Sequence, residues 1–152
     1  MMHLDAIDRT IVQQLTQDAR QSVRTLAGRV GLSPSAAGER LRRLRAGGVL
    51  AGFTVQIDPV GVGRPIDALI DVELDAAAGY QALDGTLESL PQIVDALRLT
   101  GRHDYQLRVH ARSVEDLESV IVALKDTGLV RTTATRLVLR TSPGMPRPPA
   151  LV

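Results

Sequence analysis

The feature that most constrains the fold is a pair of short helical patterns between Val23 and Ala46, which are separated by a glycine-containing turn. Gly31 suits the left-handed backbone conformation with which helices commonly end. Ser33 can then accept a hydrogen bond from a backbone N–H as the N-cap of the next helix, and Pro34 fits the first helical position, where no N–H is needed. A short helix, a tight turn and a second capped helix form a helix-turn-helix.

The second helix of this pair is strongly basic. It carries four arginines within six positions, namely Arg40, Arg42, Arg43 and Arg45. A helix-turn-helix places its second helix in the major groove of double-stranded DNA, where guanidinium groups form forked hydrogen bonds with guanine and with phosphate. The alternative is a solvated helix face with Glu39–Arg42 or Glu39–Arg43 pairs. Because the cap, the turn and the positive charge occur together, we interpret this helix as an element that reads DNA.

The face of this helix that meets DNA follows from its buried stripe, which we expect at Ala37, Leu41 and Leu44. Residues on the opposite face and its flanks are available to a ligand. Short side chains near the helix start let the backbone approach the groove, and Glu39 can accept a hydrogen bond from cytosine or hold an arginine in place. The candidate DNA contacts are therefore Ser33, Ser35, Ala36, Glu39, Arg40, Arg42 and Arg43.

Charge is distributed unevenly along the 152 residues, whose formal net charge is only +1. Residues 1–50 hold eight arginines and four acids, which gives +4, whereas residues 51–152 hold ten basic and thirteen acidic residues, which gives −3. A basic amino-terminal part joined to an acidic remainder suits a DNA-binding head on a body with another task.

Several classes of protein are excluded by composition. The chain has no cysteine, so disulfides, thiolate zinc sites and a cysteine nucleophile are excluded. The sequence MMHLDAIDRT has acids where a signal peptide has an apolar core, and no apolar run is long enough to span a membrane. We therefore expect a cytoplasmic protein.

Residues 1–50 are expected to form one helix-turn-helix domain of three helices. Apolar residues at a helical period predict the first helix from Leu4 to Thr16, with Asp5 and Asp8 in its first turns, where the helix dipole favours acids. Ser22 is expected to cap the second helix. The helix-turn-helix described above supplies the second and third helices.

The remaining chain divides into three further segments. Residues 51–65 are expected to be strand and linker, because a β-branched and aromatic run over 49–57, which could complete a wing, is followed by several glycines and prolines. Residues 66–140 are expected to form a second domain. Residues 141–152, TSPGMPRPPALV, are expected to be a flexible tail.

Hydrophobic periodicity in the second domain alternates between the strand and helix types. It predicts a strand at 67–75, a helix at 80–90, strands at 93–100 and 105–112 joined by a four-residue loop, a helix from Ser113 to Lys125, and a strand at 129–139. The order βαββαβ is that of a ferredoxin-like αβ-sandwich with both helices on one face of the sheet. The fold class is therefore α+β, with a winged-helix-like head.

The sheet face that points away from the helices carries charges on two neighbouring strands. Asp71 and Glu73 lie on the first strand, and Arg108, His110 and Arg112 lie on the third. Opposite charges could fix the register of two subunits, or they could be ordinary surface pairs. Because one helix-turn-helix offers few base contacts and two-fold DNA sites are the usual remedy, we expect a homodimer.

Taken together, the chain resembles the Lrp/AsnC, or feast/famine, transcriptional regulators. The residues that carry the resemblance are LDAIDRTIVQQLTQDAR, LAGRVGLSPSAAGERLRRLRAGGVLAGFTVQIDP, TGRHDY and GLVRTTATRLVL, which together cover nearly the whole chain. The resemblance implies a DNA-binding head and an effector-binding body, in dimers that assemble into tetramers or octamers. It implies an amino acid or a similar small metabolite as effector, with no other cofactor.

The resemblance also implies that the effector binds near the hairpin loop, and the candidates are Thr100, Gly101, Arg102, His103, Asp104 and Thr132. Family members often carry an acid directly after the loop glycine, where this chain has Arg102. Asp104 can hold an ammonium group and Arg102 a carboxylate. The alternative is an ordinary hairpin that needs Gly101 for its turn and Asp104 for a local cap.

Two other functions remain open at this stage. Siroheme decarboxylases are similar in fold, and an enzyme of that kind would have to use Arg98, Arg102, His103 and Arg108 here. A DNA architectural protein without an effector would bind broadly and in a salt-sensitive way. No nucleophile with a base, and no histidine spacing suited to a metal, is present in the sequence. We therefore expect a regulator, neither an enzyme nor a metal-binding protein.

Overall fold

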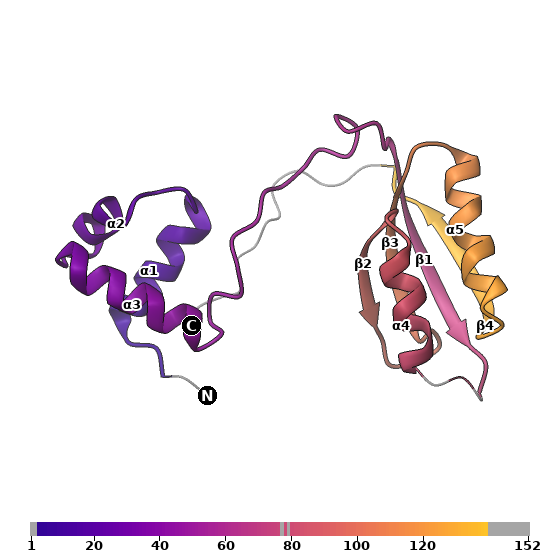
Figure 1. The fold of residues 1–152 in the computed structure, drawn as a ribbon, viewed down its shortest axis with the longest axis horizontal. Coiled ribbons are helices and arrows are strands. Elements are labelled where there is room, and N and C mark those ends of the chain that lie inside the picture. Colours follow the sequence, from indigo (N-terminus) through magenta and orange to yellow (C-terminus); the bar gives the residue numbers. More distant parts are fainter. Residues whose placement is uncertain (1–2, 77, 79, 140–152) are drawn as a thin grey trace. The chain divides into compact units, whose positions relative to one another are not determined.

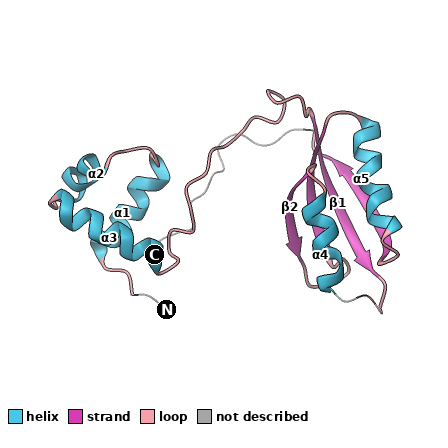
Figure 2. Cartoon of the chain, viewed as in Figure 1, coloured by secondary structure: helices cyan, strands magenta, loops and turns pink. Residues whose placement is uncertain are grey.

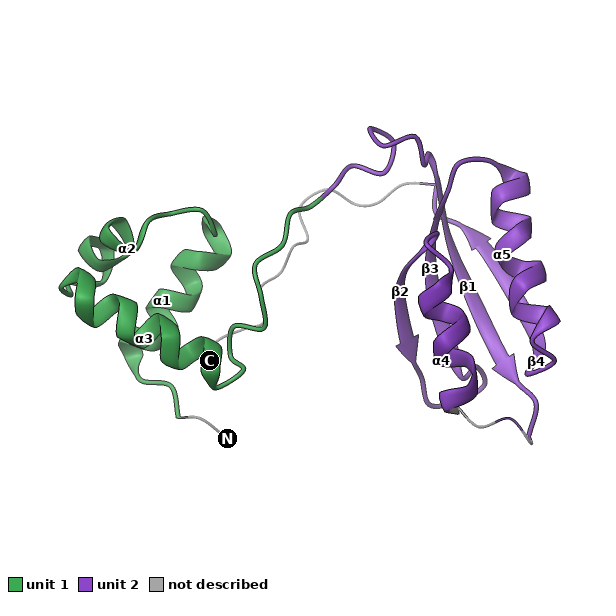
Figure 3. Ribbon diagram, viewed as in Figure 1, with its two compact units in different colours: residues 1–56, 143–152 green, residues 57–142 purple. Residues whose placement is uncertain are grey.

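The computed structural model describes residues 3–76, 78 and 80–139 (Figure 1). The chain divides into two compact units, and the division falls between Gln56 and Ile57 (Figure 3). The expected tail, residues 141–152, lies outside the described residues. Among those described, no helix combines the length and the apolar character needed to cross a membrane.

The first unit contains three helices, α1 (Ala6–Gln17), α2 (Val23–Val30) and α3 (Pro34–Ala46), as Figure 2 shows. The predicted caps are confirmed. The hydroxyl of Ser22 accepts a hydrogen bond from the N–H of Thr25, and that of Ser33 accepts one from Ala36. Gly31 ends α2 at φ 68°, a left-handed conformation that costs glycine little. The core of this unit consists of Ile11, Val12, Leu15, Leu26 and Leu44.

The strand expected over residues 49–57 is not formed. Residues 51–57 have no regular secondary structure and pair with no strand in the described part of the chain. A strand is stable only when a neighbour satisfies its backbone groups, and none of the described strands does so for this segment. Phe53, Val55 and Ile57 are left 48%, 76% and 64% exposed.

The second unit has the expected βαββαβ order. Its elements are β1 (Ile66–Leu74), α4 (Tyr80–Ser89), β2 (Ile93–Arg98), β3 (Tyr105–Ala111), α5 (Val114–Asp126) and β4 (Val130–Leu137). The sheet order is β2-β3-β1-β4, and every neighbouring pair is antiparallel. Both helices cover the same face of the sheet (Figure 2). The ferredoxin-like arrangement is therefore confirmed.

The core of the second unit lies between that face and the two helices. Alternate residues of β1 and β3 point into it, as the period of two predicts. The buried residues are Ala68, Ile70, Val72, Leu74, Tyr105, Leu107, Val109 and Ala111 from the strands and Leu83, Leu87, Leu117, Val120 and Leu124 from the helices. The two units have separate cores, because these residues and those of the first unit form two distinct clusters.

The acids on the other face of the sheet are neutralised within the chain. Arg108 makes a forked pair with Asp67 at 3.0 and 2.7 Å. The guanidinium of Arg136 lies 2.7 Å from Asp71, and Glu73 pairs with Arg131. These pairs join β1 to both of its neighbours, so neutralising the acids requires no second subunit.

Candidate nucleic-acid interface and ligand pocket

The exposed face of α3 is shaped by its first turn. Ser33 uses its hydroxyl as the N-cap, and Ser35 and Ala36 are exposed with short side chains. Of the predicted stripe, Ala37 and Leu44 are fully buried, whereas Leu41 is partly buried. The face opposite that stripe is therefore open at its amino-terminal end, where a bulky partner can approach the helix backbone.

Arg40 has a role within the chain. Its Nη1 donates to Asp5 Oδ2 at 2.5 Å and to Asp8 Oδ1 at 2.8 Å, and its side chain is 25% exposed. The pKa of the Asp5 carboxyl lies below its ordinary value because the N–H of Asp8 and then the Arg40 guanidinium donate to it. The same two acids raise the pKa of Arg40. Arg40, a predicted DNA contact, thus joins α3 to α1.

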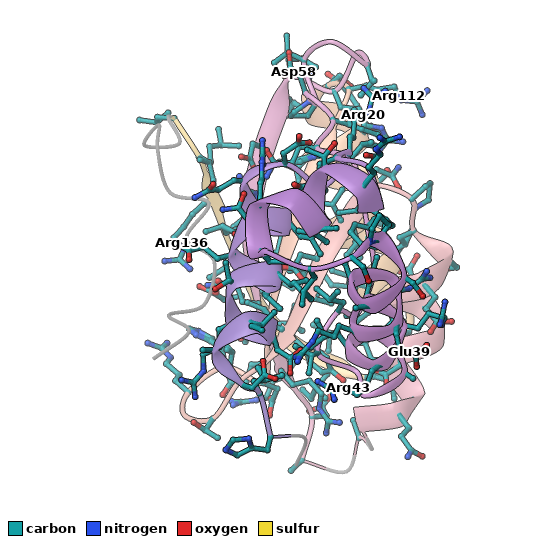
Figure 4. The ribbon with its side chains drawn as sticks, turned by 90° about the vertical axis from the view of Figure 1, so that its left-hand side faces the viewer. Arg20, Glu39, Arg43, Asp58, Arg112 and Arg136 are labelled. Atoms are coloured by element: carbon teal, nitrogen blue, oxygen red, sulfur yellow. The ribbon has the colours of Figure 1, made fainter. Side chains whose placement is uncertain are left out.

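Arg43 contacts a buried residue of the protein and is also exposed to solvent. Its Nη2 lies 2.7 Å from Oδ2 of Asp8, a residue that is completely buried. The Arg43 side chain is nevertheless 52% exposed, so it keeps surface that a partner can reach. Figure 4 labels Arg43 and Glu39 on this helix.

Arg42 and Glu39 form the exposed pair that the sequence offered as an alternative to DNA contact. Their side chains are 73% and 69% exposed. A solvent-exposed pair of this kind contributes about 0–1 kcal/mol, so a DNA phosphate or base can displace it at little cost. The pair therefore leaves both side chains available to DNA.

Asp5 and Asp8 were not recognised from the sequence as part of this interface. Their position in the first turn of α1 suggested only a favourable interaction with the helix dipole. A stronger signal was present, since Asp8 lies four residues before the buried Val12 and so on the apolar stripe of α1. A carboxylate at a core position needs a cationic partner, and the arginines of α3 supply it.

The hairpin loop borders a pocket of about 430 Å³ in the second unit. Its lining residues are Glu73, Leu74, Asp75, Ala76, Gly101, Arg102, Asp104 and Arg131. Three of the six predicted effector residues, Gly101, Arg102 and Asp104, are thus brought together. The other three, Thr100, His103 and Thr132, do not line the pocket, although Thr132 donates to Glu73 at 3.0 Å.

Asp104 fixes the loop to the end of β1. Its Oδ2 accepts a hydrogen bond from the N–H of Leu74 at 2.8 Å, and its own N–H donates to Val72 at 2.9 Å. The backbone of Gly101 has a φ of 110°, which residues other than glycine rarely adopt. The carboxylate therefore bonds to β1, 30 positions away in the sequence, instead of forming the local cap within the hairpin that was the alternative, and Asp104 also lines the pocket.

Two of the four residues that an enzyme of the siroheme-decarboxylase type would need, Arg98 and Arg108, lie on different faces of the sheet. Arg98 lies over the ring of Tyr105, which is buried in the core beneath the helices. Arg108 is bound to Asp67 on the opposite face of the sheet. Because the two arginines belong to different faces, they do not form one basic pocket with the loop.

Comparison with known proteins assigns both units. Residues 4–45 match the AsnC-type helix-turn-helix domain, and residues 67–145 match the Lrp/AsnC ligand binding domain. The HTH-type transcriptional regulator AldR of Mycobacterium tuberculosis is 40% identical over 121 residues, which cover 78% of this chain and 68% of that protein.

Two solved structures are similar over most of the chain. The structure of LrpC from Bacillus subtilis has a TM-score of 0.83 at 29% identity and covers 93% of this chain and 98% of that one. A transcriptional regulator from Neisseria meningitidis, solved in complex with L-Met, has a TM-score of 0.85 at 25% identity and covers 91% of each chain. With both domains matched in this order, the chain belongs to the Lrp/AsnC family of transcriptional regulators.

Proposed function

We propose that this protein is a sequence-specific DNA-binding regulator whose DNA affinity or assembly responds to an amino acid or a similar small metabolite. The observation that carries the proposal is the exposed face of α3, which combines a capped start, short side chains and outward-facing charged groups. The DNA contacts we propose are Ser33, Ser35, Ala36, Glu39, Arg42 and Arg43, with Arg40 holding the helix in place. Such a regulator acts in the cytoplasm, where it meets its DNA.

Dimerisation is supported by the segment that follows α3. Phe53, Val55 and Ile57 alternate with smaller or polar residues and are exposed, and their backbone has no strand partner within the described chain. The same segment of a second copy can supply a partner and cover these side chains. Two heads would then read half-sites about one helical turn, roughly 10 bp, apart. Further assembly into tetramers or octamers is part of the proposal.

An effector that carries both charges fits the pocket beside the hairpin loop. Its wall combines the carboxylates of Asp75 and Asp104 with the guanidinium of Arg102. Arg102 can bind a carboxylate, and the acids can bind an ammonium group, which is the pair of groups that an α-amino acid presents. A ligand that binds one assembly more tightly shifts the population toward it and changes DNA affinity by the same coupling free energy.

Footprinting on the region upstream of its own gene tests the DNA-binding part. We expect protection of two half-sites by the wild-type protein. Arg43→Ala should weaken specific binding, whereas Arg112→Ala, which removes the same charge from an exposed side chain of the second unit, should not. Broad binding without a protected sequence would instead indicate an architectural protein, and no protection at any ionic strength would refute the proposal.

A thermal-shift screen against the amino acids, read together with light scattering, tests the effector. We expect at least one amino acid to raise the melting temperature of the second unit and to change the particle size. If none does either at millimolar concentration, an amino acid is not the effector.

A further inference from the structure

We propose that Asp8 orients Arg43 for contact with a DNA base, so that a buried residue of α1 sets part of the sequence preference of α3. The proposal rests on the DNA-binding function above. Asp8 has no exposed surface and cannot touch DNA itself. It is a positioning residue, and its effect on DNA must pass through the arginine that it holds.

Both oxygens of the Asp8 carboxylate are occupied. Oδ1 accepts a hydrogen bond from Arg40 at 2.8 Å. Oδ2 accepts one from Arg43 at 2.7 Å and a longer one from the N–H of Asp5 at 3.3 Å. A buried carboxylate is stable only when it is paired and hydrogen-bonded, so the two guanidinium groups are held firmly in return.

The two arginines are held in different ways. Arg40 uses one nitrogen for both Asp5 and Asp8, and its side chain is only 25% exposed. Arg43 donates one hydrogen bond, from Nη2 to Asp8, and its side chain is 52% exposed. Arg40 is therefore a link between helices, whereas Arg43 has donors not used by Asp8 on a side chain that is half exposed.

The bond to Asp8 matters for recognition because the guanidinium is planar. Its donors lie in one fixed plane, so fixing Nη2 restricts the direction in which the remaining donors point. A forked contact with guanine needs that plane aligned with the base edge. Arg42 has no such anchor, since its partner Glu39 is itself 69% exposed. We assign base discrimination to Arg43 and a less directional contact to Arg42.

The experiment measures the affinity of each variant for the preferred operator and for operators that carry single base-pair changes. In Asp8→Asn, which keeps the shape of the side chain but removes its charge, discrimination at one base pair should fall about tenfold or more. The same base pair should be the one affected by Arg43→Ala. In the double variant, Asp8→Asn should cause no further loss at that base pair.

A second variant protects the test against loss of folding. Arg43→Lys keeps the positive charge but lacks the planar fork, so it should keep non-specific affinity and its salt dependence while losing discrimination at the same base pair. The control is Arg42→Ala, which should weaken binding to all operators by a similar factor. Circular dichroism establishes the folded fraction of each variant.

Three results would overturn the inference. They are unchanged discrimination in folded Asp8→Asn, unchanged discrimination in Arg43→Lys, and equal losses from Asp8→Asn with and without Arg43. Failure of the DNA-binding function itself is distinguishable, because the wild-type protein would then prefer no operator at all.

Discussion

Leu44 offers the sharpest test of the idea that the two units are stabilised by separate cores. It lies on α3 with no exposed surface, in the cluster formed with Ile11 and Leu26. Truncating a buried leucine to alanine costs about 2–5 kcal/mol, because the cavity collapses only in part. A unit of this size has a total stability of about 3–8 kcal/mol. Leu44→Ala should therefore remove a large part of the stability of the first unit.

Calorimetry of the full chain, with circular dichroism at 222 nm, measures the effect. We expect Leu44→Ala to lower the melting temperature of the first unit by roughly 10 °C or more and to leave the transition of the second unit in place. Leu107→Ala, an equally buried truncation in the other cluster, is the matched control and should do the reverse. If either variant moved both transitions by the same amount, the two cores would not be independent.

Three further predictions concern single groups. Gly31→Ala should destabilise the first unit by about 1–2 kcal/mol in urea unfolding, because φ at Gly31 is 68°. The control Gly28→Ala lies inside α2 with nothing near its added Cβ, so it should stabilise the unit. Equal effects of the two substitutions would refute the conformational argument. The pKa of the Asp116 carboxyl is lowered by hydrogen bonds from the N–H of Arg112 and then from the side-chain amide of Gln92. The stability that this carboxylate contributes is therefore present above its ordinary pKa of 3.8 and is lost as the pH falls below that value. Asp116→Asn should therefore reduce the difference in urea midpoint between pH 6 and pH 3, and an unaltered difference would contradict this. Arg102→Ala should abolish the thermal shift caused by the effector, which Arg112→Ala should retain; an intact shift would remove Arg102 from the pocket.

Local signals in the sequence predicted most of the fold. Ser22, Ser33 and Gly31 mark helix ends through bonds and dihedral angles that involve only a few neighbouring residues. The strands were predictable for a similar reason, since a period of two follows directly from burial on one face. The segment over 49–57 has the composition of a strand but has no strand partner among residues 3–76, 78 and 80–139, and composition alone does not show whether a partner exists.

The candidate sites were only partly predictable because their remaining residues come from distant parts of the sequence. Glu73 and Arg131 reach the pocket beside Gly101 because the β1–β4 register brings them there across 58 positions. Asp8 reaches α3 across 35 positions. Periodicity assigns a residue to a face of its own helix, but it does not identify what lies opposite that face.

The pairing of Asp8 changes what the arginines of α3 can contribute to DNA binding. A count of charges treats all of them alike, as counter-charges to phosphate whose effect weakens with salt. The positive charge of an arginine anchored to a buried carboxylate is partly offset by the negative charge of that partner, yet its remaining donors are held in a defined direction. Anchoring therefore reduces the salt-dependent part of the binding free energy while increasing the part that depends on the base. On this physical basis Arg42, exposed beside Glu39, chiefly supports affinity, and Arg43 chiefly supports specificity.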